Sequence, residues 1–161
     1  MSSLPQSQPE AYPHVAELPA FDVIGITTRT SNEDEFSGNS KIGPLWGAFM
    51  GGGGESIPNA VDETIFSLYT HYESDHQGAY DVILGRSVQP GTQAPVGTVA
   101  KHIPAATYLV FPAESRTPAA IVAAWKGVYC YFDEPGAPKR AFTVDFERYS
   151  DNGVELFIAI R

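Results

Sequence analysis

The feature that most constrains the fold of this chain is an order of predicted elements that occurs twice: strand, helix, strand, strand. The first module spans residues 16–88 and the second spans 97–161, and a linker rich in Pro and Gly joins them. Each predicted helix carries one tryptophan, Trp46 or Trp125. Because repeated order indicates duplication, we predict an α+β fold of two modules related by a pseudo-two-fold axis, forming one domain over 16–161.

The individual elements follow from hydrophobic spacing and turn residues. Alternating or continuous apolar runs predict strands over 16–30, 63–75, 79–88, 97–113, 141–149 and 154–161. Helical spacing predicts helices over 39–50 and 117–133. Thr117 is expected to cap the second helix, with Pro118 at its first position. The Asn-Gly pair at 152–153 predicts a tight hairpin between the last two strands.

Composition narrows the class of function. The 161 residues carry a formal net charge of −9 and only ten Lys and Arg, without a basic cluster. Nucleic-acid binding depends on such clusters, so we expect no direct nucleic-acid contact. An acidic surface instead favours the approach of cations.

We expect no signal for export or membrane insertion in this chain. Residues 1–15 are polar and rich in Pro, and we expect a disordered tail there rather than a signal peptide. The longest apolar run, 119–125, is too short to span a bilayer. The single cysteine, Cys130, excludes an internal disulfide, which suits the cytoplasm.

The closing run VELFIAI (154–160) poses the question of why Glu155 lies in an apolar strand. A buried carboxylate costs several kcal/mol unless it is paired. Laying residues 72–85 on 149–160 matches Tyr72 with Tyr149 and Asp81 with Glu155, so the first module has an acid at a similar place. One alternative is that Glu155 lies on a wet face of the sheet and pairs with Arg148 or Lys101.

The other alternative is a shared ligand cleft. Strand side chains alternate between faces, and we expect one face of each module to pack under its helix while the other carries acids and aromatics. Antiparallel sheets would then have helices on one face and a cleft between the halves. The candidate ligand-binding residues are Glu155, Glu147, Asp81, Tyr69, Tyr149 and Phe157, with the edges of Trp46 and Trp125. Carboxylates and aromatic rings together attract organic cations.

Three stretches resemble one known family. They are YTHYESDHQGAYDVILGRSV (69–88), DFERYSDNGVELFIAIR (145–161), and TRTSNEDE followed by IGPLWGAF and IPN, together with one Trp on each helix. They resemble the gyrase-inhibitor-like small-molecule-binding family, also known as bacterial transcription activator effector-binding domains. The likeness covers residues 15–161 and is to the stand-alone branch, which includes integron cassette proteins that bind cationic drugs.

The resemblance implies a non-catalytic protein that binds cationic or amphipathic small molecules. It places Glu155 opposite the ligand cation and Glu147 at the acidic position of the preceding strand, so Glu155→Gln is expected to weaken cation binding tenfold. Regulators of the family add a helix-turn-helix segment that this sequence lacks. A separate regulator protein or a homodimer is therefore the expected macromolecular partner.

Two other functions stay open. A cleft carboxylate with a raised pKa suits a hydrolase of electrophilic natural products, and the acidic surface suits a protein-binding inhibitor. We expect no cofactor, since the GGGG run at 51–54 is not followed by the Gly-Lys-Ser/Thr of a phosphate-binding loop. His71 and His76, in HYESDH, straddle a turn and are not expected to converge on a metal.

Overall fold

The computed structural model describes residues 13–161. Their strands are β1 (His14–Leu18), β2 (Phe21–Ser31), β3 (Ile65–Thr70), β4 (Ala79–Val88), β5 (Val99–Ile103), β6 (Ala106–Pro112), β7 (Val144–Ser150) and β8 (Gly153–Ala159). The helices are α1 (Asn32–Phe36), α2 (Ile42–Ala48), the π-helical turn η2 (Phe49–Gly53) and α3 (Pro118–Asp133). Of the predicted tail, residues 1–12 lie outside the described part, and His14 and Val15 belong to β1.

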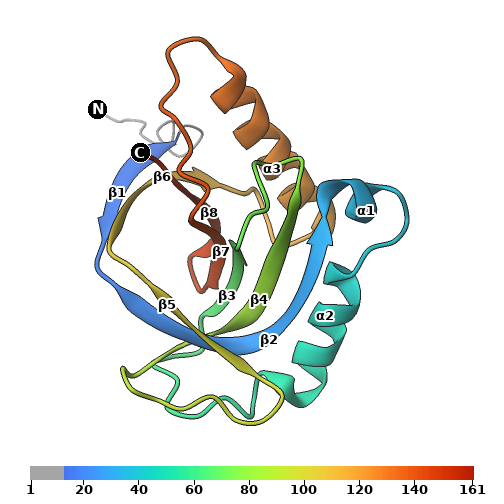
Figure 1. The fold of residues 1–161 in the computed structure, drawn as a ribbon, viewed down its shortest axis with the longest axis vertical. Coiled ribbons are helices and arrows are strands. Elements are labelled where there is room, and N and C mark those ends of the chain that lie inside the picture. Colours follow the sequence, from blue (N-terminus) through green and yellow to red (C-terminus); the bar gives the residue numbers. More distant parts are fainter. Residues whose placement is uncertain (1–12) are drawn as a thin grey trace, which may run out of the picture.

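The strands form a single antiparallel sheet that curls into a half-barrel (Figure 1). Its order is β1-β6-β8-β7-β3-β4-β2-β5. The predicted duplication is confirmed, because β2-α2-β3-β4 and β6-α3-β7-β8 repeat the same order and meet at the central β3·β7 pair. The α+β fold is therefore as predicted, although the two modules share one continuous sheet.

Two of the predicted strands are each broken in two by a proline. Pro19 interrupts 16–30 and Pro104 interrupts 97–113, because proline has no N–H to continue a ladder. The short strand before each break crosses to the other half of the sheet. As a result β1 pairs with β6 and β5 pairs with β2, so each half is edged by a strand from the other.

The helices begin and end close to where local chemistry predicts. Thr117 accepts a hydrogen bond from the backbone N–H of Ala120 and caps α3, with Pro118 in its first turn. The first predicted helix is α2, which continues into η2 through the Gly-rich run; Gly52 there has a φ of 132°. The short helix α1 was not predicted; Ser31 caps it by accepting from the backbone N–H of Asp34.

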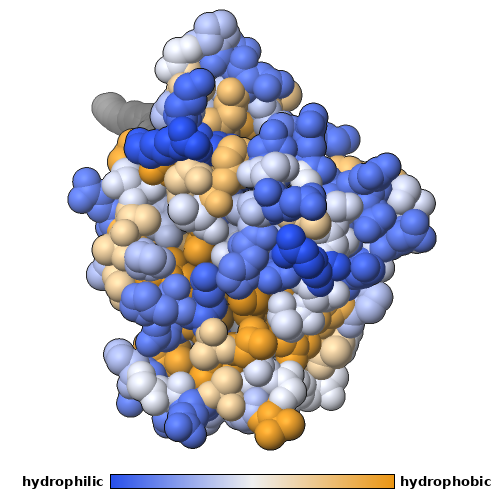
Figure 2. All heavy atoms as spheres, in the orientation of Figure 1, coloured by the Kyte–Doolittle hydropathy of each residue, from blue (hydrophilic) through white to orange (hydrophobic). Residues whose placement is uncertain are grey.

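The sheet separates two layers of packed side chains. The helices lie outside the curl (Figure 1), and Leu45, Phe49, Ile121 and Val128 pack on that outer face. A second core fills the inside of the curl with residues such as Val23, Leu68, Ile83, Tyr108, Val110, Phe146 and Phe157. In Figure 2 hydrophobic atoms show between hydrophilic ones over the opening of the curl. Both faces of the central strands β3 and β7 are therefore largely buried.

Within residues 13–161 no helix has the length and apolarity needed to cross a membrane.

Candidate functional site

A cavity of about 640 Å³ lies between α2 and α3, above the central strands of the sheet. Its aromatic lining comes from both halves and consists of Phe36, Trp46, Tyr69, Tyr72, Tyr80, Trp125, Tyr129 and Tyr149. Its charged lining consists of Glu35, Arg116, Lys126, Arg140 and Glu147. A volume of this size accommodates a drug-sized organic molecule.

The cavity sits on the pseudo-two-fold axis. Ser67 and Glu147 pair with each other across β3 and β7, and each also pairs with a leucine of its own hairpin. These registers make Ser67 and Glu147 equivalent positions of the two halves, and Tyr69 equivalent to Tyr149. The duplication therefore supplies matching tyrosines but only one carboxylate at the axis.

Glu147 is buried, with 3% of its surface exposed, and it accepts three hydrogen bonds from cavity side chains. Its Oε2 accepts from the Tyr69 hydroxyl and from Trp125 Nε1, both at 2.7 Å, and its Oε1 accepts from the Tyr149 hydroxyl at 2.5 Å. Burial raises the pKa of the Glu147 carboxyl, although these hydrogen bonds act in the opposite direction. All three donors are neutral, and Glu147 forms no ion pair with any residue of 13–161.

The aromatic walls repeat the symmetry of the sheet. Trp125 of α3 meets Tyr69 edge to face at a centroid distance of 5.3 Å. Trp46 of α2 meets Tyr149 in the same way at 5.0 Å. Each tryptophan thus packs on the tyrosine of the other half, and together they form two facing walls with π surfaces suited to a cation.

The structure brings together five of the eight predicted site residues, Glu147, Tyr69, Tyr149, Trp46 and Trp125, but on the opposite face of the sheet from the one expected. The predicted assignment of side chains to the two faces of β3 and β7 is shifted by one residue. Phe146 pairs with Phe157 and points into the curl, so Glu147 lies on the helix side. Alternation in β7 separates Val144 and Phe146 from Glu147 and Tyr149, but the apolar pair packs inside the curl and not under the helix.

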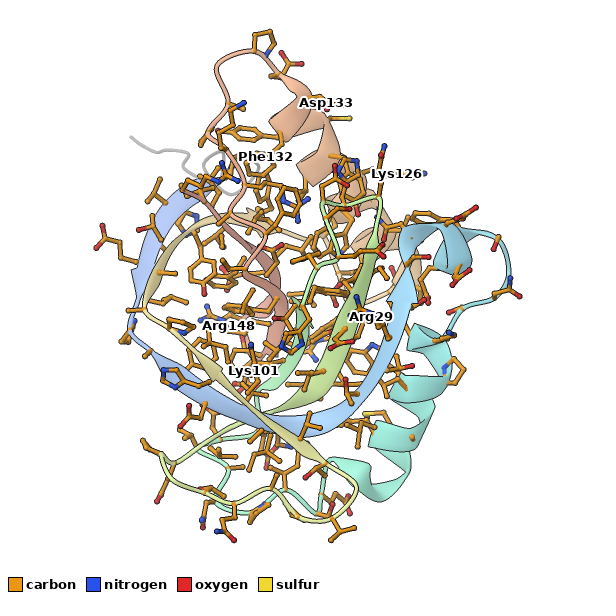
Figure 3. The ribbon with its side chains drawn as sticks, viewed as in Figure 1. Arg29, Lys101, Lys126, Phe132, Asp133 and Arg148 are labelled. Carbon is orange, nitrogen blue, oxygen red and sulfur yellow. The ribbon has the colours of Figure 1, made fainter. Side chains whose placement is uncertain are left out.

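Glu155 does not share a face with Glu147, so the expected convergence of the two acids in one cleft is wrong. Glu155 pairs with Arg148 across β7 and β8, with Arg148 donating to its carboxylate at 2.7 Å. The Arg148 guanidinium also lies over the Phe157 ring, 4.6 Å from its centroid. Arg148 is inside the curl in Figure 3. The structure therefore agrees with the alternative interpretation, in which Glu155 pairs with Arg148.

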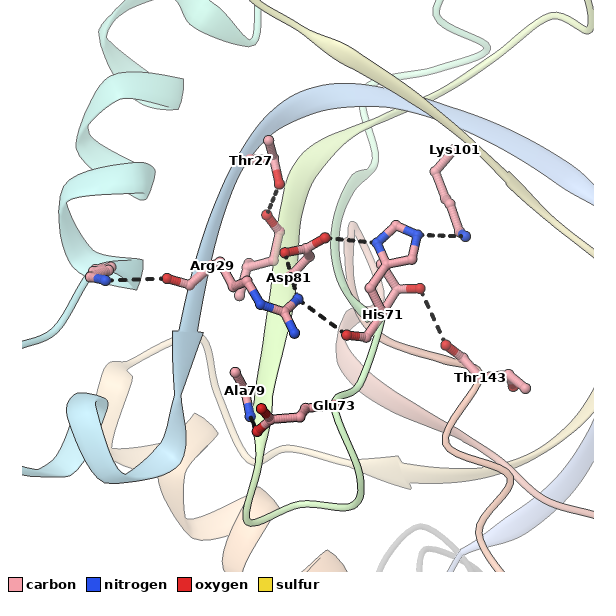
Figure 4. Close-up of polar contacts among 11 residues, drawn as sticks. Thr27, Arg29, His71, Glu73, Ala79, Asp81, Lys101 and Thr143 are labelled. Carbon is pink, nitrogen blue, oxygen red and sulfur yellow. Dashed lines mark hydrogen bonds and ion pairs between the residues drawn. The ribbon is translucent and has the colours of Figure 1, made fainter.

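Asp81 also lies away from the cavity, in a polar cluster drawn in Figure 4. Its carboxylate accepts from Arg29 at 3.0 Å and contacts His71 Nδ1 at 2.7 Å. Lys101 Nζ lies 3.3 Å from the other ring nitrogen of His71. The match of Asp81 with Glu155 is wrong as well, because the strand registers make Ile83 the equivalent of Glu155.

Several lining residues were missed by the sequence analysis. Asn32 of α1 donates to the Tyr129 hydroxyl of α3 at 2.9 Å and accepts from the Tyr80 hydroxyl at 2.8 Å, which ties the two halves together at one end of the cavity. The capping pattern Ser-Asn-Glu-Asp at 31–34 was a local signal for α1. No local sequence pattern indicates that α1 contacts α3.

The histidines of HYESDH diverge, as expected. His71 contacts Asp81, while the ring of His76 lies 5.4 Å from that of Tyr129. Across residues 13–161 no three His, Cys, Asp or Glu side chains come together in a way that suits a metal ion.

Comparison with known proteins identifies the family. Residues 14–160 match the family model described as Cass2, integron-associated effector binding protein. The chain belongs to this family. A solved Cass2 relative, the integron cassette protein VCH_CASS2 from the mobile metagenome of Vibrio cholerae, is 34% identical, with a TM-score of 0.76 over 93% of this chain and 96% of that one.

Two further proteins are less similar to this chain. YobU of Bacillus subtilis (strain 168), whose name proposes a role in transcriptional regulation, is 26% identical over 93% of this chain and 98% of its own length. The structure of SAV2435 bound to tetraphenylphosphonium is 16% identical, with a TM-score of 0.70 over 92% of this chain and 93% of that one. At this identity the second likeness concerns the fold.

Proposed function

We propose that this effector-binding protein takes organic cations into the cavity between α2 and α3. Glu147 is the counter-charge, and Trp46, Trp125, Tyr69 and Tyr149 are the walls that contact the ligand. The observation that carries the proposal is a buried carboxylate at the cavity floor whose hydrogen-bond donors are all neutral. A bound cation would supply the missing positive charge.

Physical magnitudes favour a cation over a neutral ligand. A charge removed from water interacts much more strongly with an opposite charge than it does at the surface. A desolvated cation–π contact adds about 2 kcal/mol. SAV2435, which has the same fold, was solved with the organic cation tetraphenylphosphonium, and this supports the same class of ligand here.

The proposal is tested by titrating tetraphenylphosphonium and the neutral triphenylphosphine oxide into the protein by calorimetry. We expect the cation to bind at least about tenfold more tightly, a difference of about 1.4 kcal/mol. Equal affinities would contradict the role of Glu147.

A second experiment tests the hydrolase alternative, since a carboxyl with a raised pKa also suits proton transfer. We expect an ester-bearing cation to be recovered unchanged after incubation with the protein; conversion to product would favour the hydrolase.

Cation binding is expected to weaken as the pH falls. Burial raises the pKa of Glu147 above 4.5, so this carboxylate becomes protonated and neutral at a pH where exposed glutamates are still ionised. Tetraphenylphosphonium keeps its charge at every pH, so any loss of affinity belongs to the protein. The affinity is measured by calorimetry from neutral pH downward, and it should already be falling before the pH reaches 4.5. A constant affinity down to pH 4.5 would contradict this prediction.

The wider role proposed here is to sequester such a compound or to sense it for a partner. The formal net charge of −9 opposes direct binding to phosphates. A separate regulator protein or a second copy of this chain is the proposed macromolecular partner. Size-exclusion chromatography with and without the cation would reveal the second copy.

A further inference from the structure

The cavity holds a second carboxylate, Glu35 of α1, which also lines its wall. Its Oε2 accepts from the Thr30 hydroxyl at 2.7 Å and from the backbone N–H of Lys41 at 2.8 Å, and its Oε1 accepts from the Ser40 hydroxyl at 2.7 Å. Burial acts to raise the pKa of the Glu35 carboxyl, but these hydrogen bonds outweigh it and the net shift is downward. Glu35 is therefore held in its ionised form.

Glu35 resembles Glu147 in lacking a cationic partner. Neither carboxylate forms an ion pair with another residue of 13–161. Tyr80 lies on the cavity wall between them, because its hydroxyl donates to Asn32 of α1 at 2.8 Å and its ring lies 5.7 Å from that of Tyr69, which donates to Glu147. The cavity therefore presents two separate negative charges with aromatic surface between them.

None of the cationic side chains that line the cavity forms an ion pair with Glu35 or Glu147. Arg140 is committed to Asp145, to which it donates at 2.7 Å. Arg116 donates to the carbonyl oxygen of Ser150, at the turn between β7 and β8. Lys126 is exposed on α3 (Figure 3) and forms no ion pair within the described chain.

We propose that the cavity selects organic dications, with one cationic group at Glu147 and the other at Glu35. This inference rests on the proposed function, because it assigns the first cationic group to the same carboxylate. The part of the ligand between the two cations is apolar, since Ile42, Tyr80 and Tyr129 are among the residues that line the cavity. Glu35 is then the residue that distinguishes a dication from a monocation.

The test compares decamethonium, which joins two trimethylammonium groups by an alkyl chain, with decyltrimethylammonium, which has the same chain and one such group. Affinities are measured by calorimetry for the protein, Glu35→Gln and Glu147→Gln. Glu33→Gln is the matched control, because this substitution removes the same charge from the same helix. Glu33 is exposed and does not line the cavity. Glu35→Asp keeps the charge and is expected to retain the preference.

For Glu35→Gln we expect decamethonium to bind about fivefold more weakly, as fits a partly exposed ion pair, while decyltrimethylammonium is unchanged. Glu33→Gln should affect neither ligand. If Glu35→Gln weakens both ligands equally, or neither, the dication inference is overturned, although a monocation that still depends on Glu147 would leave the proposed function standing. If neither ligand binds the unmodified protein while tetraphenylphosphonium does, the dication inference is overturned and the proposed function stands.

Discussion

Replacing Glu147 by Gln is expected to weaken tetraphenylphosphonium binding by about thirtyfold or more. Loss of one member of a buried charge pair costs about 2–5 kcal/mol, and each tenfold in affinity is about 1.4 kcal/mol. Gln has nearly the shape of Glu and keeps one oxygen for the Tyr69 hydroxyl and Trp125 Nε1, which share one carboxylate oxygen of Glu147, while its amide N–H can donate to the Tyr149 hydroxyl oxygen. The effect should therefore appear in the calorimetric affinity while the circular dichroism spectrum stays unchanged.

Glu155→Gln is the matched control for that measurement. It removes the same charge from the same sheet, but Glu155 lies on the other face and is paired with Arg148. The affinity of this variant for the cation is expected to stay within about twofold of that of the unmodified protein, since Arg148 already partners the Glu155 charge and the sheet separates it from the cavity. Equal losses in both variants would mean that the overall charge of the protein, and not the cavity, attracts the ligand. An unchanged affinity in Glu147→Gln would place the ligand elsewhere.

Replacing Asp145 by Ala is expected to lower the free energy of unfolding by about 3–5 kcal/mol, because it leaves a buried arginine without its partner. Asp145 is fully buried and accepts from Arg140 at 2.7 Å, from the Tyr72 hydroxyl at 2.5 Å and from the backbone N–H of Ala159 at 2.8 Å. The Arg140 side chain is 6% exposed. Urea unfolding followed by circular dichroism measures the change.

A double variant separates the ion pair from the packing around it. In Asp145→Leu/Arg140→Met both charges are gone, and much of the lost stability should return, because apolar residues often replace a buried ion pair at little cost. Arg140→Met alone should destabilise the protein, since it leaves the Asp145 carboxylate unpaired. Additive losses in the double variant would show that the pair itself contributes little and that the two side chains act through separate contacts.

Much of the fold was predictable because its signals are local. Thr117 and Pro118 fix the start of α3 through one hydrogen bond and one restricted φ angle. The β7–β8 hairpin forms as predicted, although its turn residues are Asp151 and Asn152, and Gly153 opens β8 with a φ of 105° that favours glycine. The repeated order of elements then gave the α+β architecture without any knowledge of which strands meet.

The site was harder to predict because it depends on which face of a strand meets which layer. In β7 the neighbours Glu147 and Arg148 are both charged, and both layers that they border are apolar. Alternation therefore allows either residue to face the helices, and only the pairing with β8 decides between them. Glu35 was missed for a different reason: α1 is held by the bond from Asn32 to Tyr129, 97 residues away along the chain.

Each half of the sheet is edged by a strand from the other half, and this determines what happens when the chain is cut between the two halves. A cut in the connection between β4 and β5 would give two pieces, each holding the strand that completes the border of the other. Such pieces would have to rejoin along three seams, β1 with β6, β3 with β7 and β2 with β5. Neither piece could serve as a reduced receptor by itself, whereas the reunited pair would regenerate the floor where Ser67 meets Glu147 and could report the ligand by complementation.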